Sequence, residues 1–187
     1  MPDESELGTS VLPITESGVA CAEDVAAADL LRHRRSELED IRQATQISDH
    51  KVLMELIDCG VRAESLNILM LVPLVHVAWA NGTIEAEERD AILEVAAQVG
   101  VRADSPGFAL LNGWLCCRPN RSLIRTWKDY VAAIRTFLSP EAYDSLHLRT
   151  VNRAWAIAEA SGGLLGFMKV SRAEEAAIQE LNLAFIV

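Results

Sequence analysis

The chain has 187 residues, 50% of them apolar, and a formal net charge of −10. This length suits one compact domain, or one domain with a tail, and so high an apolar share excludes a chain that is disordered throughout. The negative charge argues against a general nucleic-acid binder, because phosphate binding needs a clustered positive surface.

The N-terminal residues differ in character from the rest of the chain. Residues 1–22 have no helical or strand periodicity and carry proline and glycine among serine, threonine and acidic residues. They open with "MPDESELG", which lacks the apolar segment of a signal peptide. This composition predicts a flexible acidic tail over residues 1–22 and a single all-helical domain over residues 23–187.

Helical periodicity begins at about residue 23 and predicts helices over 23–46, 50–58 and 63–80. Gly60 ends the second of these, because glycine is a common helix-stop residue. The third contains the most apolar run of the chain, Leu66 to Ala80, which falls short of the roughly 20 residues that a membrane span requires. We therefore expect a buried central helix that kinks at Pro73.

Five more helices are expected after the central one. A helix over 85–99 stops at Gly100, and the pairs Ser105-Pro106 and Ser139-Pro140 are typical helix starts, with serine as the N-cap and proline in the first turn. An apolar stripe marks a helix over 121–137, and the last helix covers 172–185. No segment alternates with period two. The sequence predicts an all-α, compact bundle of seven to eight helices.

Two stretches of the chain resemble each other. They are "VAWANGTIEAEERDAI" at 77–92 and "IAEASGGLLGFMKVSRAEEAAI" at 157–178, and each joins a helix to a second helix through small residues. Each also places a glutamate, Glu88 or Glu174, beside an apolar stripe in the first turn of the second helix. The two stretches predict two similar helix-loop-helix corners.

The two glutamates have a structural and a functional interpretation. Because burying a bare carboxylate is costly, each must have a partner. Ser171-x-x-Glu174 is a capping box, in which serine and glutamate side chains bond each other's backbone N–H groups. Glu85 takes the serine position in the first corner and is a poorer cap, although Glu88 can still reach back to the loop backbone. A role in binding a metal ion or another ligand is the alternative.

"VAWANGTIEAEERDAIL" resembles the signature of the tellurite-resistance TerB-like proteins, and the resemblance covers roughly residues 45–185. It implies a helical bundle with two similar halves, a place in tellurite and chemical-stress response, metal binding, and a scaffold role at membrane-linked complexes. Carried over by position, the metal residues would be Asn81, Glu85 and Glu88 in the first corner and Glu174 in the second. The family's usual aspartate before glycine is Asn81 here and Ser161 in the second copy.

These observations predict a non-enzymatic, cytoplasmic interaction module that binds a protein partner and is modulated by a divalent cation. We expect the protein to bind no nucleic acid and not to insert into a membrane, but to associate peripherally with a membrane-linked complex.

The four cysteines, Cys21, Cys59, Cys116 and Cys117, form no C-x-x-C pair or disulfide framework and fit a reducing compartment. One alternative is a metal-dependent enzyme that uses carboxylates and His76, and another is a helical partner-binding domain without an ion. His76 is expected to be a hydrogen-bonded core residue, and the four tryptophans are expected to fill the core.

Overall fold

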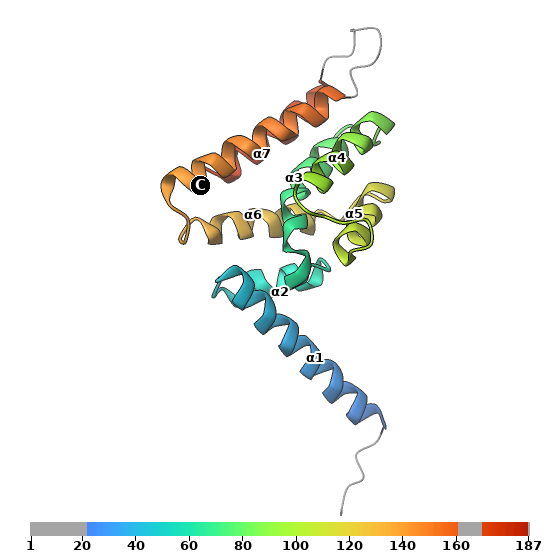
Figure 1. Ribbon diagram of the computed structural model, residues 1–187, viewed down its shortest axis with the longest axis vertical. Coiled ribbons are helices and arrows are strands. Elements are labelled where there is room, and N and C mark those ends of the chain that lie inside the picture. The colour runs from blue at the N-terminus through green and yellow to red at the C-terminus, as the bar shows by residue number, and fades with distance from the viewer. Residues whose placement is uncertain (1–21, 161–169, 187) are drawn as a thin grey trace, which may run out of the picture. The chain divides into compact units, whose positions relative to one another are not determined.

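The computed structural model describes residues 22–160 and 170–186, which contain eight α-helices, one 3-10 helix and no strand (Figure 1). The predicted all-α fold is confirmed. The predicted tail lies outside the described residues except for Ala22, which begins α1. The helices are α1 (Ala22–Thr45), α2 (His50–Asp58), η1 (Ala63–Met70), α3 (Val72–Ala78), α4 (Ala86–Gln98), α5 (Pro106–Cys116), α6 (Ser122–Ile134), α7 (Pro140–Ala160) and α8 (Arg172–Ala184).

The chain divides into two compact units, residues 1–34 and 35–187. In the first unit, the described part of α1 carries an ion pair between Arg32 and Asp29, one turn apart. It also exposes the apolar side chains of Val25, Leu30 and Leu31. The second unit contains the rest of α1, the remaining helices and the buried core.

The central apolar segment is two helices, and the prediction of one kinked helix over 63–80 was wrong. Residues 63–70 form the 3-10 helix η1, which closes with a bond from the Leu71 N–H to the Ile68 carbonyl (2.9 Å). Pro73 then lies in the first turn of α3, where its missing N–H breaks no helical hydrogen bond. The described ranges therefore hold nine helices, where seven to eight were expected. None of these nine is both long and apolar enough to cross a bilayer.

Local signals place most helix ends where the sequence predicts them. The hydroxyl of Ser105 accepts a hydrogen bond from the Phe108 N–H (3.2 Å), and that of Ser139 accepts one from the Ala142 N–H (3.2 Å). Gly60, after α2, has a φ of 82°, which a residue with a side chain rarely adopts. These caps confirm the predicted starts of α5 and α7 and the predicted end of α2.

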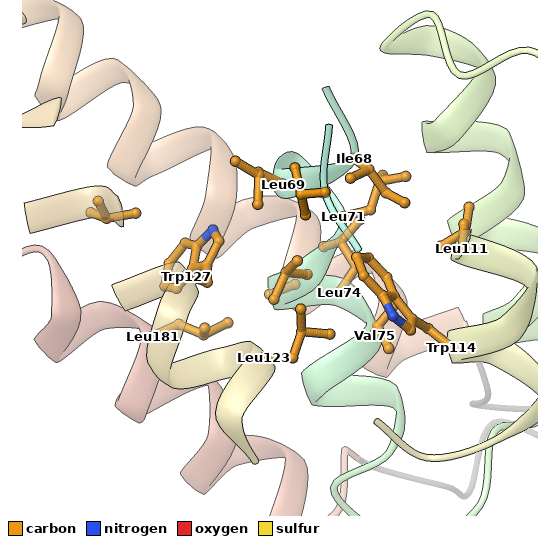
Figure 2. Packing of buried hydrophobic residues seen from close by; sticks show 14 of the residues in the cluster. Ile68, Leu69, Leu71, Leu74, Val75, Leu111, Trp114, Leu123, Trp127 and Leu181 are labelled. Carbon is orange, nitrogen blue, oxygen red and sulfur yellow. The ribbon is translucent and has the colours of Figure 1, made fainter. Parts of the chain in front are cut away.

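The core of the second unit forms around α3. Figure 2 shows Leu74 and Val75 of α3 between Leu111 and Trp114 of α5 on one side and Leu123 of α6 on the other. Two of the tryptophans, at 114 and 127, are buried as expected, but Trp155 is 36% exposed on α7 and does not fill the core.

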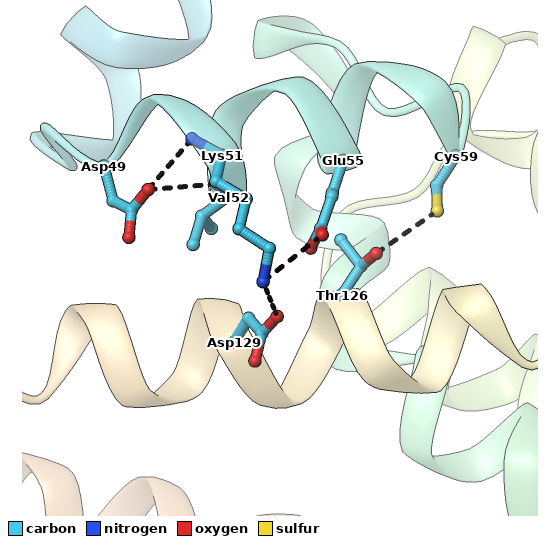
Figure 3. A network of polar contacts seen from close by, with 7 residues as sticks. All are labelled: Asp49, Lys51, Val52, Glu55, Cys59, Thr126 and Asp129. Carbon is cyan, nitrogen blue, oxygen red and sulfur yellow. Dashed lines mark hydrogen bonds and ion pairs between the residues drawn. The ribbon is translucent and has the colours of Figure 1, made fainter.

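Polar contacts connect α2 to α6 at the edge of this core (Figure 3). The ammonium of Lys51 lies 3.4 Å from Asp129 and 3.5 Å from Glu55, while the Cys59 thiol donates to the Thr126 hydroxyl at 3.7 Å. Lys51 is 69% exposed, and exposed ion pairs contribute little to stability. The buried apolar side chains of α2 therefore supply most of the stabilisation of this contact.

We expect Leu74→Ala to lower the free energy of unfolding by about 2 to 5 kcal/mol, because Leu74 is 1% exposed and its loss leaves a cavity in the core. Leu148→Ala is the matched control, since Leu148 is 60% exposed on α7. Urea denaturation followed by circular dichroism measures both. Equal effects of the two substitutions would contradict this description of the core.

Candidate functional site

The two corners predicted from the sequence contact each other reciprocally. One is formed by α3 and α4, and the other by α7 and α8. Helix α3 contacts both helices of the second corner, and α7 contacts both helices of the first.

In the first corner, the glutamate side chain holds the start of α4. The Glu85 backbone N–H donates to Glu88 Oε2 at 2.8 Å. Before the helix, the Thr83 N–H donates to Asn81 Oδ1 (3.1 Å), and Gly82 adopts a φ of 104° that glycine accommodates without strain. The predicted return of Glu88 to the loop backbone is therefore present.

The second corner uses the same arrangement with a better cap. The Ser171 N–H donates to Glu174 Oε2 at 2.6 Å, and the Glu174 N–H donates to the Ser171 hydroxyl at 3.2 Å. This reciprocal pair confirms the predicted capping box at the start of α8. Ser161, the position that matches Asn81, lies outside the described residues.

The two capping glutamates form a buried carboxyl pair. Glu88 is 0% exposed and Glu174 is 2% exposed. The amide of Asn81 donates to Glu174 Oε1 at 3.3 Å, which connects the first corner to the second. Glu88 Oε1 has no hydrogen-bond partner among the residues that the structure describes. The pair therefore contains one buried oxygen without a donor.

The environment of Glu88 favours its neutral form. Burial is the largest cause that raises the pKa of this carboxyl from its ordinary 4.5 to about 7, and the bond from the Glu85 N–H opposes that rise. The negative charge of Glu174, which lies close to Glu88, raises the pKa further. At neutral pH the pair can therefore hold a proton, since two carboxylates in a dry site resist ionising together.

The four residues predicted to hold a metal ion come together only in part. Asn81, Glu88 and Glu174 lie at the junction of the corners, whereas Glu85 contributes its backbone N–H. The side-chain amide of Asn81 donates a hydrogen bond to Glu174, and its oxygen accepts one from the backbone N–H of Thr83 in the loop.

Calcium takes about six to eight oxygen ligands. Within the described part of the chain, Glu88 Oε1 is the one buried carboxylate oxygen at this junction that lacks a hydrogen-bond partner. Across the described ranges, no group of three or more His, Cys, Asp and Glu side chains is arranged to hold a metal ion. The side chains at the junction therefore do not complete the shell of a hard cation.

His76 belongs to a separate polar group, away from the carboxyl pair. Its Nε2 lies 3.2 Å from Glu180 Oε2, and the ammonium of Lys128 lies 2.5 Å from Glu180 Oε1. Burial lowers the pKa of His76, although Glu180 opposes that shift. The predicted hydrogen bond of His76 is present, but His76 is partly exposed and not a core residue. No local pattern could have identified Glu180, which is 104 positions away.

Sequence reasoning also missed that Glu88 and Glu174 meet. The signal for this was present, because the two residues hold equivalent positions in two similar corners. What was missing was the packing of one corner against the other.

Compared with family models, with curated proteins and with solved structures, the chain matches none of them.

The carboxyl pair predicts a specific dependence of stability on pH. Because the pKa of Glu88 is higher in the folded chain than in the unfolded chain, the folded chain binds more protons between about pH 4.5 and pH 7. The contribution of Glu88 to the free energy of unfolding therefore falls as the pH rises through this window, by about 3 kcal/mol in total. We expect Glu88→Gln to remove this contribution, because glutamine keeps an oxygen for the Glu85 N–H and has no charge.

Urea denaturation from pH 5 to pH 8 measures this effect. Glu88→Gln should match the wild type near pH 5 and exceed its stability at pH 8. Glu87→Gln is the matched control, since Glu87 is exposed in the same turn of α4. A pH profile of Glu88→Gln that parallels the wild type over the whole range would contradict the proton-holding pair.

Proposed function

We propose that the protein is a non-enzymatic, cytoplasmic interaction module of the TerB-like kind. Protonation of Glu88 stabilises the contact between its two corners, and ionisation of Glu88 destabilises it. The observation that carries the proposal is the fully buried Glu88 carboxyl beside Glu174, at the junction of the two corners. When Glu88 carries a proton, Glu88 and Glu174 form a hydrogen bond between the two corners. Without it, two negative charges face each other in a site of low dielectric.

The burial of the pair favours a structural module over a metal-dependent enzyme that uses the same carboxylates. A catalytic carboxylate must come within hydrogen-bond reach of its substrate or of a metal-bound water. Glu88 and Glu174 each use one oxygen to cap a helix, and both are almost wholly excluded from solvent. These contacts suit groups that hold the corners together.

The surface supports a protein partner. In the described part of the second unit, every exposed large apolar side chain lies after residue 136. Exposed apolar side chains that are restricted to one part of a structure are typical of interaction surfaces. These side chains are Phe137, Leu138, Leu148, Trp155, Leu183 and Ile186.

The biological setting of the proposal comes from the resemblance to TerB-like proteins. That resemblance implies a role in the response to tellurite or other chemical stress, with a partner that belongs to a membrane-linked complex. The carboxyl pair adds a physical reason for such a role, because it responds to proton concentration close to neutral pH. A fall in cytoplasmic pH would then strengthen the junction of the corners.

Partner capture from the native cells tests the interaction surface. We expect Leu148→Ser combined with Leu183→Ser to weaken retention of the partner by about tenfold, because burial of apolar anchors dominates most interfaces. Leu30→Ser combined with Leu31→Ser is the matched control, since these leucines are at least as exposed but belong to α1. Loss of the partner in the control alone would place the surface on α1 and contradict the proposal.

Calorimetric titration with Ca²⁺ and Mg²⁺ tests whether a cation rather than a proton modulates the module. We expect no saturable binding by the wild type at pH 7.5, because only one buried carboxylate oxygen at the junction, Glu88 Oε1, lacks a hydrogen-bond partner among the described residues. Binding by the wild type that disappears in Glu88→Gln would contradict the proton-based proposal and favour a cation between the corners.

A further inference from the structure

A cavity of about 580 Å³ lies between α3, α6, α8 and the segment that joins α5 to α6. Its volume falls within the range of about 300 to 1,000 Å³ that is common for small-molecule sites. The apolar part of its wall includes Val72 of α3, Trp79 directly after α3, Ile124 of α6 and Ala176 of α8. The cavity is therefore large enough and apolar enough to bury the body of a small organic ligand.

The side chains that line this cavity have a net positive charge, whereas the net charge of the whole chain is negative. Four basic side chains and one acidic side chain line it, although the whole chain has a net charge of −10. Arg121, the N-cap residue of α6, is followed by Arg125 and Lys128 at intervals of four and three residues, so the three lie on one face of that helix. Arg118 precedes them in the segment before α6, and Glu180 is the acid.

The single acid is already compensated. Burial opposes the ionisation of Glu180, yet the contacts with Lys128 (2.5 Å) and His76 (3.2 Å) hold the pKa of this carboxyl below its ordinary value. Lys128 therefore neutralises Glu180 inside the cavity. The positive charge that remains belongs to the three arginines.

The three arginines have no such partner. Within the described ranges, the side chains of Arg118, Arg121 and Arg125 make no ion pair and no hydrogen bond. The first turns of α6 and α8 also line the cavity, through Leu123 and Ala173, and helix N-termini favour negative charge. Guanidinium groups match the planar, paired oxygens of carboxylates and phosphates.

We propose that this cavity binds a small organic oxyanion, a molecule with an apolar body that ends in a carboxylate or phosphate group. Arg121 and Arg125 hold the anionic end near the start of α6, with Arg118 beside them. The apolar body lies against Trp79 and Ile124. This site is separate from the carboxyl pair, and the proposal does not depend on the function proposed above.

Calorimetric titration of the full chain at low salt tests the proposal with four probes. These probes are octyl phosphate, octanoate, inorganic phosphate and octyltrimethylammonium. We expect saturable binding of octyl phosphate or octanoate, and the tighter of the two identifies the anionic group. Octyltrimethylammonium tests the need for negative charge, and inorganic phosphate tests the need for an apolar body. Equally tight binding of either one would overturn the proposal, as would the absence of binding by both octyl anions.

A pair of variants of equal charge tests the arginines. Arg121→Gln with Arg125→Gln changes the net charge from −10 to −12, and so does Arg102→Gln with Arg149→Gln, which removes two exposed arginines that do not line the cavity. We expect the first pair to weaken binding of the octyl anion by at least about tenfold, and the second by less than about twofold. Similar weakening by both pairs, or no weakening by the first, would overturn the proposal. All four arginines are exposed, so both variants should keep the wild-type melting temperature.

Discussion

The second unit depends on the burial of α3. Six of its seven residues are buried, and a helix of this length is not stable in water without tertiary contacts. Its neighbours, among them η1, α4, α6, α7 and α8, supply those contacts. The remaining residue, His76, is partly exposed and lines the cavity. A short segment that must be surrounded on nearly every side therefore organises both the core and the two sites discussed above.

The junction of the two corners has an unusual physical character, because it combines close packing with two acids. Each glutamate satisfies a backbone donor at the start of its own helix, which explains why an acid is placed there. The packing of the corners then brings both acids into a dry site, where their charges repel. One group therefore stabilises its own helix and, when ionised, opposes the contact between helices. Protonation of Glu88 removes the repulsion between the two carboxylates, and Glu88 loses this proton close to neutral pH.

The cavity beside α3 has the opposite electrostatics. Basic side chains from α6 and from the segment before it converge there in a chain that is acidic overall. Glu180 is matched by Lys128, but Arg118, Arg121 and Arg125 are not matched by acids of the described chain. The described part of the chain therefore presents two separate environments, a buried acidic junction and a cavity lined mainly by basic side chains.

The sequence by itself determined the helices and their caps, because these depend on contacts between residues three or four positions apart. Gly60, Ser105, Ser139 and the Ser171-Glu174 capping box all act as their local patterns predict. It also predicted two similar corners, each with its glutamate. Only the tertiary structure decided that Glu88 meets Glu174, that His76 meets Glu180, and that the arginines of α6 face a cavity. These pairings join residues that are far apart in the chain, and they arise from how the helices pack rather than from any local spacing. Even the division of residues 63–80 into η1 and α3 belongs to this second group, since proline permits either a kink or a new helix and packing selects between them.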